Sequence, residues 1–426
     1  MIEDVSIAEN LLDVFAVLTN LNSYTIAWSH TSDPLPTFAT SFLSAVWSVL
    51  STTTALHSLT LDMPFHDVCQ VFSVTPFNSP TYLTALSLKF GNDSPELEHS
   101  LADLPSFLNV LSPCLRSLSL YVIGHFDLSI FFATLKHFSL LTDLSLSLPC
   151  DPGHLSDTQG FAAFLNAHKT QLKSLVFSPH FCCGPRGAKN PKSTSQESST
   201  WECHAFSTLS FPALHSLELR LNPFGTRDDY VLNTPPKFTA AVAREKLTGR
   251  EILKGEDIDK DPVPLTLSIL GRLILLDDLK ILLSPFSLPK EKSDEDPQHS
   301  ITSIRVPESL ILETHILSPN LLYLLSSSLP RLKSLNLTYT WIGELGCDKE
   351  VCFYFSLSCW QTCDSLFETY QRNFVKYLRK RTYPHWHLRN FTLNSTTHED
   401  ARRRCERAIR KAVPSLDGGP VKDHMT

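Results

Sequence analysis

The chain has 426 residues, and a single hydrophobic core stops growing at about 250 to 300 residues, so the sequence predicts several domains or a repeating architecture. The formal charge of -7 excludes a protein whose whole surface binds nucleic acid. Only 14 residues are glycine, and neither a glycine-rich phosphate-binding motif nor a G-x-S-x-G nucleophile motif occurs. We therefore expect no enzyme activity and no cofactor.

The N-terminal sequence MIEDVSIAEN is acidic and lacks the positively charged start of a secretory signal. The most apolar stretch, residues 265–283, contains four charged side chains and is therefore too polar for a membrane span. Eleven cysteines are scattered among leucine positions, a pattern typical of reduced thiols rather than of a disulfide framework. We expect a cytoplasmic or nuclear protein with no membrane partner.

A six-residue phrase, L-x-x-L-x-L, recurs along the chain. Its last two apolar residues are two positions apart, so in a β-strand they point to one face and their neighbours to the other. Each copy therefore predicts a strand. A weaker copy begins at Leu21, and the others begin at Leu56, Leu83, Leu115, Leu141, Leu172, Leu214, Leu276, Leu332 and Leu388.

Helix-like apolar patterns separate several of these phrases, at residues 104–113, 126–138 and 160–172. A single strand cannot bury its apolar face alone, whereas stacked strand and helix pairs bury a continuous core. The sequence therefore predicts an α/β solenoid of about nine or ten irregular repeats, with helices on the convex side. Its parallel strand ladder is expected to run from Leu21 to Leu393.

The repeated phrase with helical spacers resembles the leucine-rich-repeat proteins, and its irregular spacing resembles the repeat region of fungal F-box leucine-rich-repeat proteins. That family often has Asn or Cys eight residues after the first leucine, and here only Asn222 matches, so we expect variable turns. The resemblance implies a non-catalytic protein–protein interaction scaffold. The alternative is the substrate-recognition part of an SCF-type ubiquitin ligase receptor whose F-box is missing from this chain, because no LP-x-E opening precedes Leu21.

Breaks in the apolar pattern predict the domain organisation. We expect N-terminal leucine-rich repeats over residues 1–183, a mobile loop over 184–206, and irregular C-terminal repeats over 207–395. Charged insertions are expected at 226–262 and 289–300. Residues 396–426 are predicted to form a basic helix and a disordered tail.

Possible zinc ligands gather in the C-terminal part of the chain, at Cys347, Cys352, Cys359, Cys363, His385 and His387. Structural zinc sites use ligand pairs two to four residues apart beside turn residues, whereas these cysteines lie in an aromatic-rich apolar stretch. The pair within HFCC, residues 180–183, lacks a second ligand pair. We therefore expect buried structural cysteines and no metal.

The strand positions that alternate with the leucines are mostly small and hydroxylic, so few of them offer the Trp, Tyr and Arg side chains that dominate interface energies. The exceptions, at or just beyond the strand phrases, predict contacts with an unknown protein partner. For Trp341 the alternative is a core position beneath the following helix. The predicted partner-binding residues are Tyr121, Arg220, Tyr339 and Trp341.

Basic residues are concentrated near the C-terminus. Residues 371–411 contain twelve Lys or Arg and three Asp or Glu. This segment suits a nucleic-acid, nuclear-import or acidic-partner patch, and the alternative is a set of solvated helix faces that cap the repeats. We do not expect nucleic acid as the main partner, and ligase components are expected only if an F-box exists upstream.

Overall fold

A computed structural model describes fourteen parts of the chain, and it forms two compact units. Unit 1 comprises Met1–Leu214 with Phe224–Thr226, and unit 2 comprises His215–Pro223 with Arg227–Thr426. The described residues are 22–27, 56–64, 68, 82–92, 103–124, 127–149, 157, 159–180, 211–220, 264–270, 276–286, 306–342, 363–395 and 399–416.

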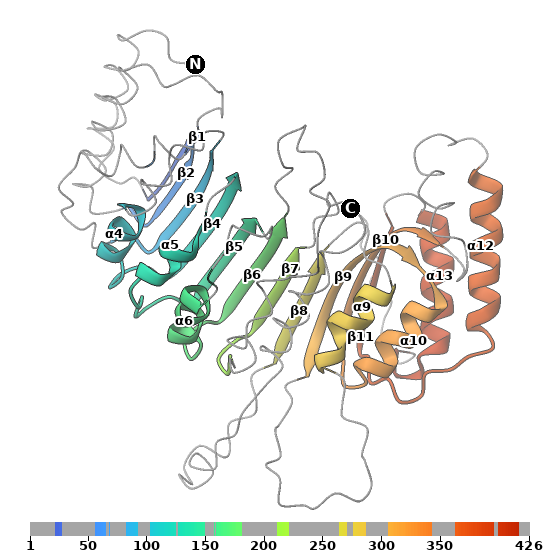
Figure 1. Cartoon of the computed structure of the whole chain (residues 1–426). Helices are drawn as coiled ribbons and strands as arrows, with labels where there is room; N and C mark the ends of the chain where they lie inside the picture. Colours follow the sequence, from blue (N-terminus) through green and yellow to red (C-terminus); the bar gives the residue numbers. More distant parts are fainter. Residues whose placement is uncertain are drawn as a thin grey trace, which may run out of the picture. The chain divides into compact units, whose positions relative to one another are not determined.

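Unit 1 contains parallel strands that follow one another across the sheet in chain order (Figure 1). Each strand begins two residues after the first leucine of a predicted phrase, so all six phrases from Leu21 to Leu172 are confirmed as strands. The strands are β1 (Ser23–Ala27), β2 (Ser58–Asp62), β3 (Ala85–Asn92), β4 (Ser117–Gly124), β5 (Asp143–Pro149) and β6 (Ser174–His180).

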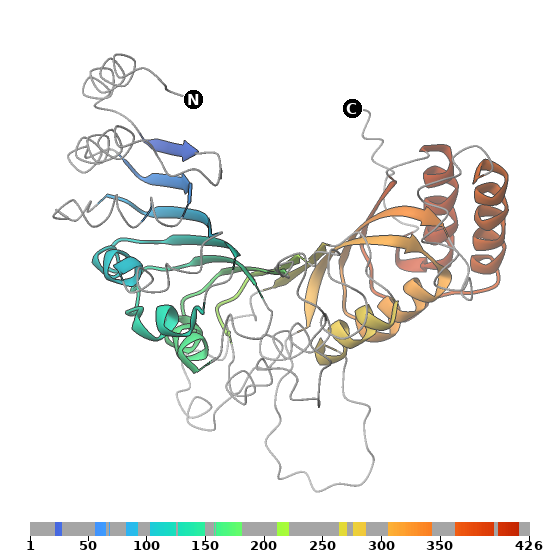
Figure 2. The same ribbon diagram turned by 45° about the horizontal axis from the view of Figure 1, so that its top comes forward.

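The leucines of these phrases align across the strands. Leu86 pairs with Leu118, Leu118 with Leu144 and Leu144 with Leu175, and each of these side chains is buried. The predicted helical spacers are also confirmed, and Figure 2 shows these helices on one face of the strands. The helices are α4 (Asp103–Val110), α5 (Ser129–Thr134) and α6 (Gln159–His168).

A backbone hydrogen-bond pattern repeats where the strands of unit 1 begin. The carbonyl oxygen of the second residue in one phrase accepts hydrogen bonds from two successive N–H groups of the next phrase. The Thr84 oxygen accepts from Arg116 and Ser117 at 2.7 and 2.9 Å, and the Arg116 oxygen accepts from Thr142 and Asp143. These bonds fix the register of each strand at its first residues, ahead of the leucines that point into the core.

Unit 2 also contains parallel strands in chain order. Phrases at Leu214, Leu332 and Leu388 each precede a strand, as predicted. The strands are β7 (Ser216–Arg220), β8 (Leu265–Leu270), β9 (Pro307–Leu317), β10 (Ser334–Ile342) and β11 (Asn390–Ser395).

The strand predicted from the phrase at Leu276 is wrong, because these residues form helix α9 (Leu276–Leu283). Leu279, Leu282 and Leu283 are buried at helical spacing. The strands that the phrase search missed are β8 and β9. Both have the same pattern with proline in place of the first leucine, PLTLSI from residue 264 and PESLIL from residue 307.

The other helices of unit 2 pack beside its strands (Figures 1 and 2), and α13 and α12 contact β11 and β10. Helix α10 begins with a Ser318 cap, whose side chain accepts the Leu321 N–H at 3.2 Å, followed by Pro319 at the first helical position. The helical segments are α10 (Pro319–Ser328), α12 (Cys363–Leu378), α13 (Glu399–Ala412), and the short 3-10 segments η2 (Ser284–Phe286) and η3 (Pro414–Leu416).

The described residues thus form a mixed α/β structure with a large parallel sheet that is not closed. The loop predicted at 184–206 and the insertions predicted at 226–262 and 289–300 lie outside the described residues, as do residues 417–426. Within the described parts of the chain, none of the helices has the length and apolar character needed to cross a membrane.

Candidate functional site

The face of the sheet that carries the residues alternating with the leucines is called the outer face here. In unit 1 its central row has Val176 on β6, but on β2 to β5 it consists of small hydroxyl side chains: Thr60, Ser87, Ser119 and Ser145. All four are half-buried. Such side chains offer hydrogen bonds but little apolar contact area, so this row alone is a weak anchor for a partner.

The next row along the strands is different, because it places an acid, a base and an aromatic ring on three adjacent strands. Asp62 on β2, Lys89 on β3 and Tyr121 on β4 are paired in register. Lys89 Nζ lies 2.8 Å from Asp62 Oδ2 and 5.6 Å from the centre of the Tyr121 ring. The ion pair therefore holds the ammonium group beside the aromatic face, where a cation–π attraction is favourable.

An exposed apolar residue follows Tyr121 on the same face of β4. Ile123, two residues further along β4, lies on the same face and is 39 % exposed, and Tyr121 is 38 % exposed. Gly91 on β3 pairs with Ile123 and has no side chain to cover it. Asp62, Lys89, Tyr121 and Ile123 together form what we call the outer-face cluster. Ile123 is not among the predicted partner-binding residues, although strict alternation from Leu118 already places it outward.

Arg220, the last residue of β7, is exposed as predicted from its outward position. Its Nε lies 2.5 Å from Oε1 of Glu218, two residues earlier on the same strand. The Arg220 side chain is largely exposed and Glu218 is half-buried, so the pair contributes little to stability and the Arg220 guanidinium stays accessible from the outer face of unit 2.

The side chain of Tyr339 is fully buried, so, contrary to the prediction of a partner-binding residue, it cannot contact a partner. It follows Leu335 and Leu337 at spacing two and so belongs to the leucine face of β10. Burial raises the pKa of its hydroxyl well above the ordinary range. Trp341 is only half-buried, although it follows Tyr339 at spacing two. Its neighbour Ile342 is fully buried instead, so the alternation of buried and outward positions shifts by one residue there. Trp341 is therefore neither a fully exposed anchor nor a complete core residue.

Only some of the possible metal ligands lie in the described part of the chain. Within the described residues, no group of three or more His, Cys, Asp or Glu side chains is arranged to hold a metal ion. Cys347, Cys352 and Cys359 lie outside the described residues, and Cys363 is described only as the first backbone position of α12. His385 and His387 are both exposed before β11.

Comparison with known proteins adds no constraint on this site. Neither a protein-family model nor a curated protein matches the sequence.

Proposed function

We propose that this chain is a non-catalytic protein–protein interaction scaffold of the leucine-rich-repeat type. The aligned leucines, the parallel strands and the helices on one face support an irregular leucine-rich-repeat solenoid. In such an arrangement the leucines are committed to the core, so recognition falls to the alternate residues and to the loops after the strands.

The observation that carries this proposal is the outer-face cluster. Tyrosine is among the side chains that most often supply large binding energies, and Tyr121 presents its ring next to Ile123. The Asp62 carboxylate offsets the charge of Lys89, so the cluster suits a partner that offers an apolar side chain framed by hydrogen-bonding groups.

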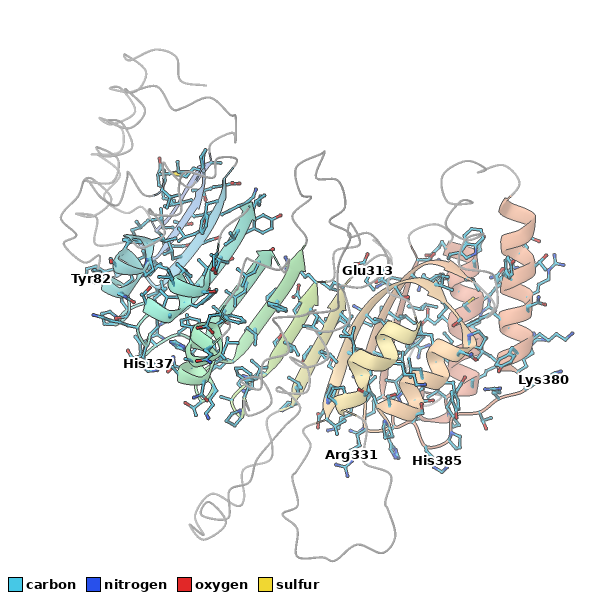
Figure 3. All side chains as sticks on the ribbon, in the orientation of Figure 1. Tyr82, His137, Glu313, Arg331, Lys380 and His385 are labelled. Atoms are coloured by element: carbon cyan, nitrogen blue, oxygen red, sulfur yellow. The ribbon has the colours of Figure 1, made fainter. Side chains whose placement is uncertain are left out.

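Affinity capture from the native cells, with quantitative mass spectrometry, tests the proposal. Wild-type protein is compared with Tyr121→Ala and with Tyr82→Ala, because Tyr82 is a second exposed tyrosine of unit 1 outside the cluster (Figure 3). Tyr121→Ala should reduce capture of a defined protein by at least about 30-fold, corresponding to about 2 kcal/mol. Tyr82→Ala should retain it, and both variants should keep the wild-type melting temperature.

If all three chains captured the same set of proteins, the outer-face cluster would not be the binding site. A reduced melting temperature of Tyr121→Ala, with capture lost in proportion to unfolding, would instead make Tyr121 a structural residue. The more conservative Tyr121→Phe variant separates the ring from the hydroxyl, and we expect it to keep most of the captured protein.

A further inference from the structure

The basic segment identified in the sequence divides into two parts with different electrostatic surroundings. On helices α12 and α13, many of the cations are paired with carboxylates three or four residues away. These ion pairs are Arg372–Glu368, Arg402–Glu399, Arg403–Glu399, Arg402–Glu406 and Arg410–Glu406, with N···O distances between 2.6 and 3.1 Å.

The loop between α12 and β11 has no such partners in its own sequence. Residues 379–389 contain four Lys or Arg and two His but no Asp or Glu. Residues 329–333, before β10, add two more cations, and the two segments lie side by side. The His387 N–H donates to the Pro330 oxygen at 3.3 Å, and the Arg389 N–H donates to the Lys333 oxygen at 2.7 Å.

Both segments therefore lie at the end of unit 2 where β10 and β11 begin. We call their six permanent cations the cationic edge, and all six side chains are exposed. In Figure 3, Arg331 and His385 point away from the ribbon at its lower end, and Lys380 points to the right from the end of α12. The cationic edge consists of Arg331, Lys333, Arg379, Lys380, Arg381 and Arg389.

One member of the edge is held in place by aromatic rings. The Arg381 guanidinium lies 4.4 Å from the centre of the Tyr377 ring and 5.9 Å from that of Tyr323, and Tyr323 is 56 % exposed. Stacking on a ring face leaves the in-plane N–H groups of arginine available for a carboxylate. The position is thus pre-organised for a planar anion.

Among the described residues, one edge cation pairs with a carboxylate. Lys333 Nζ pairs with Oε1 of Glu308 on β9 at 2.7 Å, and among the described residues no other ion pair involves an edge cation. The negative C-terminal end of α12 stabilises the positive charges of Arg379 and its neighbours, which explains their position there. It does not account for Arg331 and Arg389, which come from the starts of two strands.

We propose that the cationic edge binds an acidic polypeptide segment rich in Asp and Glu. The chain has 37 Lys and Arg against 44 Asp and Glu, so without the six edge cations it has 31 against 44. Residues 371–411 carry a net positive charge, so the acidic excess lies in the rest of the chain, and a short acidic peptide matches the extent of the edge better than a long nucleic acid. The proposal stands on the charge of the edge and is independent of the outer-face cluster.

Fluorescence anisotropy with a labelled peptide of about ten residues, mostly Glu, tests the proposal on the full chain. A Gln peptide of the same length and an oligothymidylate of equal charge are the comparison probes. The edge variant is Arg331→Gln, Arg379→Gln and Lys380→Gln combined. The matched control removes three exposed cations of α13, as Arg404→Gln, Arg407→Gln and Lys411→Gln combined, and so has the same net charge.

We expect the Glu peptide to bind wild type more tightly than either comparison probe, and to weaken as salt is raised from about 50 to about 300 mM. The edge variant should lose at least about tenfold in affinity, and the α13 variant less than about threefold. If the combined edge variant melts early, the single Lys380→Glu variant must still weaken binding. Equal losses in both triple variants, no binding of the Glu peptide, or tighter binding of the oligothymidylate would each overturn the proposal.

Discussion

His168 shows at the scale of one residue how a buried polar group is accommodated in unit 1. Its ring is fully buried at the end of α6, and its Nε2 accepts the Phe138 N–H at 2.9 Å. Its Nδ1 lies 2.6 Å from the Phe164 oxygen and donates to it. The imidazole is therefore neutral, with its proton on Nδ1. Burial, reinforced by the neighbouring His137, lowers the pKa of His168 to about 4.

This arrangement predicts a loss of stability in mild acid. The folded-state pKa of about 4 lies below the ordinary value of 6.5, so between these values the unfolded chain binds a proton that the folded chain does not. The contribution of His168 to the free energy of unfolding should fall by about 3 kcal/mol as the pH drops from 7 to 4. Urea denaturation at a series of pH values measures this slope.

His168→Gln should be less stable at pH 7 but should lose the contribution of His168 to the slope. His57→Gln is the matched control, since His57 is exposed in the same unit. A slope in His168→Gln equal to that of wild type would contradict the assignment of the buried neutral imidazole.

At the scale of elements, α5 and α6 lie in close contact at Gly160. A Cβ atom there would lie 2.8 Å from the backbone nitrogen of Ala133 and 2.9 Å from its Cβ. Phe132 and Phe161 pack across the same contact with ring centres 4.7 Å apart. Glycine is therefore required by the packing of the two helices, despite its low helix propensity.

Gly160→Ala should destabilise the protein by about 1 to 3 kcal/mol, because the steric cost of overpacking exceeds the gain of about 1 kcal/mol in helix propensity. Denaturant unfolding measures the change. Asn166→Ala, at an exposed position of the same helix, should be neutral or slightly stabilising. A stabilised Gly160→Ala protein would show that the helices separate at no cost.

At the scale of the whole molecule, an open sheet must protect its edge strands from pairing with another chain. Among the described strands β11 pairs only with β10, and α13 lies over its free edge. Arg402 Nη1 donates to the Leu393 oxygen at 3.0 Å, and Arg410 Nη2 donates to the Phe391 oxygen at 3.1 Å. Part of the basic helix thus satisfies carbonyl groups of the terminal strand.

Replacing both arginines, as Arg402→Met with Arg410→Met, should lower the free energy of unfolding by about 2 to 4 kcal/mol, since two charge-assisted hydrogen bonds are lost. It should also promote self-association through the uncovered edge, detected by light scattering. Arg404→Met with Arg407→Met removes two exposed cations of the same helix and should remain monodisperse like wild type. Identical behaviour of the two double variants would argue against edge protection.

The repeated phrase was sufficient to predict most strands, because spacing two between leucines is a local property of the chain. It failed where local patterns overlap. Residues from Leu276 match the phrase, yet Leu279 and Leu283 also have helical spacing, and the helix is the observed structure. The strands β8 and β9 were missed because Pro264 and Pro307 stand in place of the first leucine of the phrase. Tyr339 was assigned outward although its spacing from Leu337 already placed it inward.

By itself the sequence determined the parallel α/β ladder, the burial of its leucines and the helices between strands in unit 1, because periodicity dictates which side chains can share a face. Only the tertiary structure decided which residues of different repeats become neighbours. Strand register placed Asp62, Lys89 and Tyr121 in one row, and loop packing joined Arg331 to the cations after α12. It also placed two α13 arginines beside the Leu393 and Phe391 carbonyls of β11. Such contacts join residues far apart in the chain, so no local pattern records them.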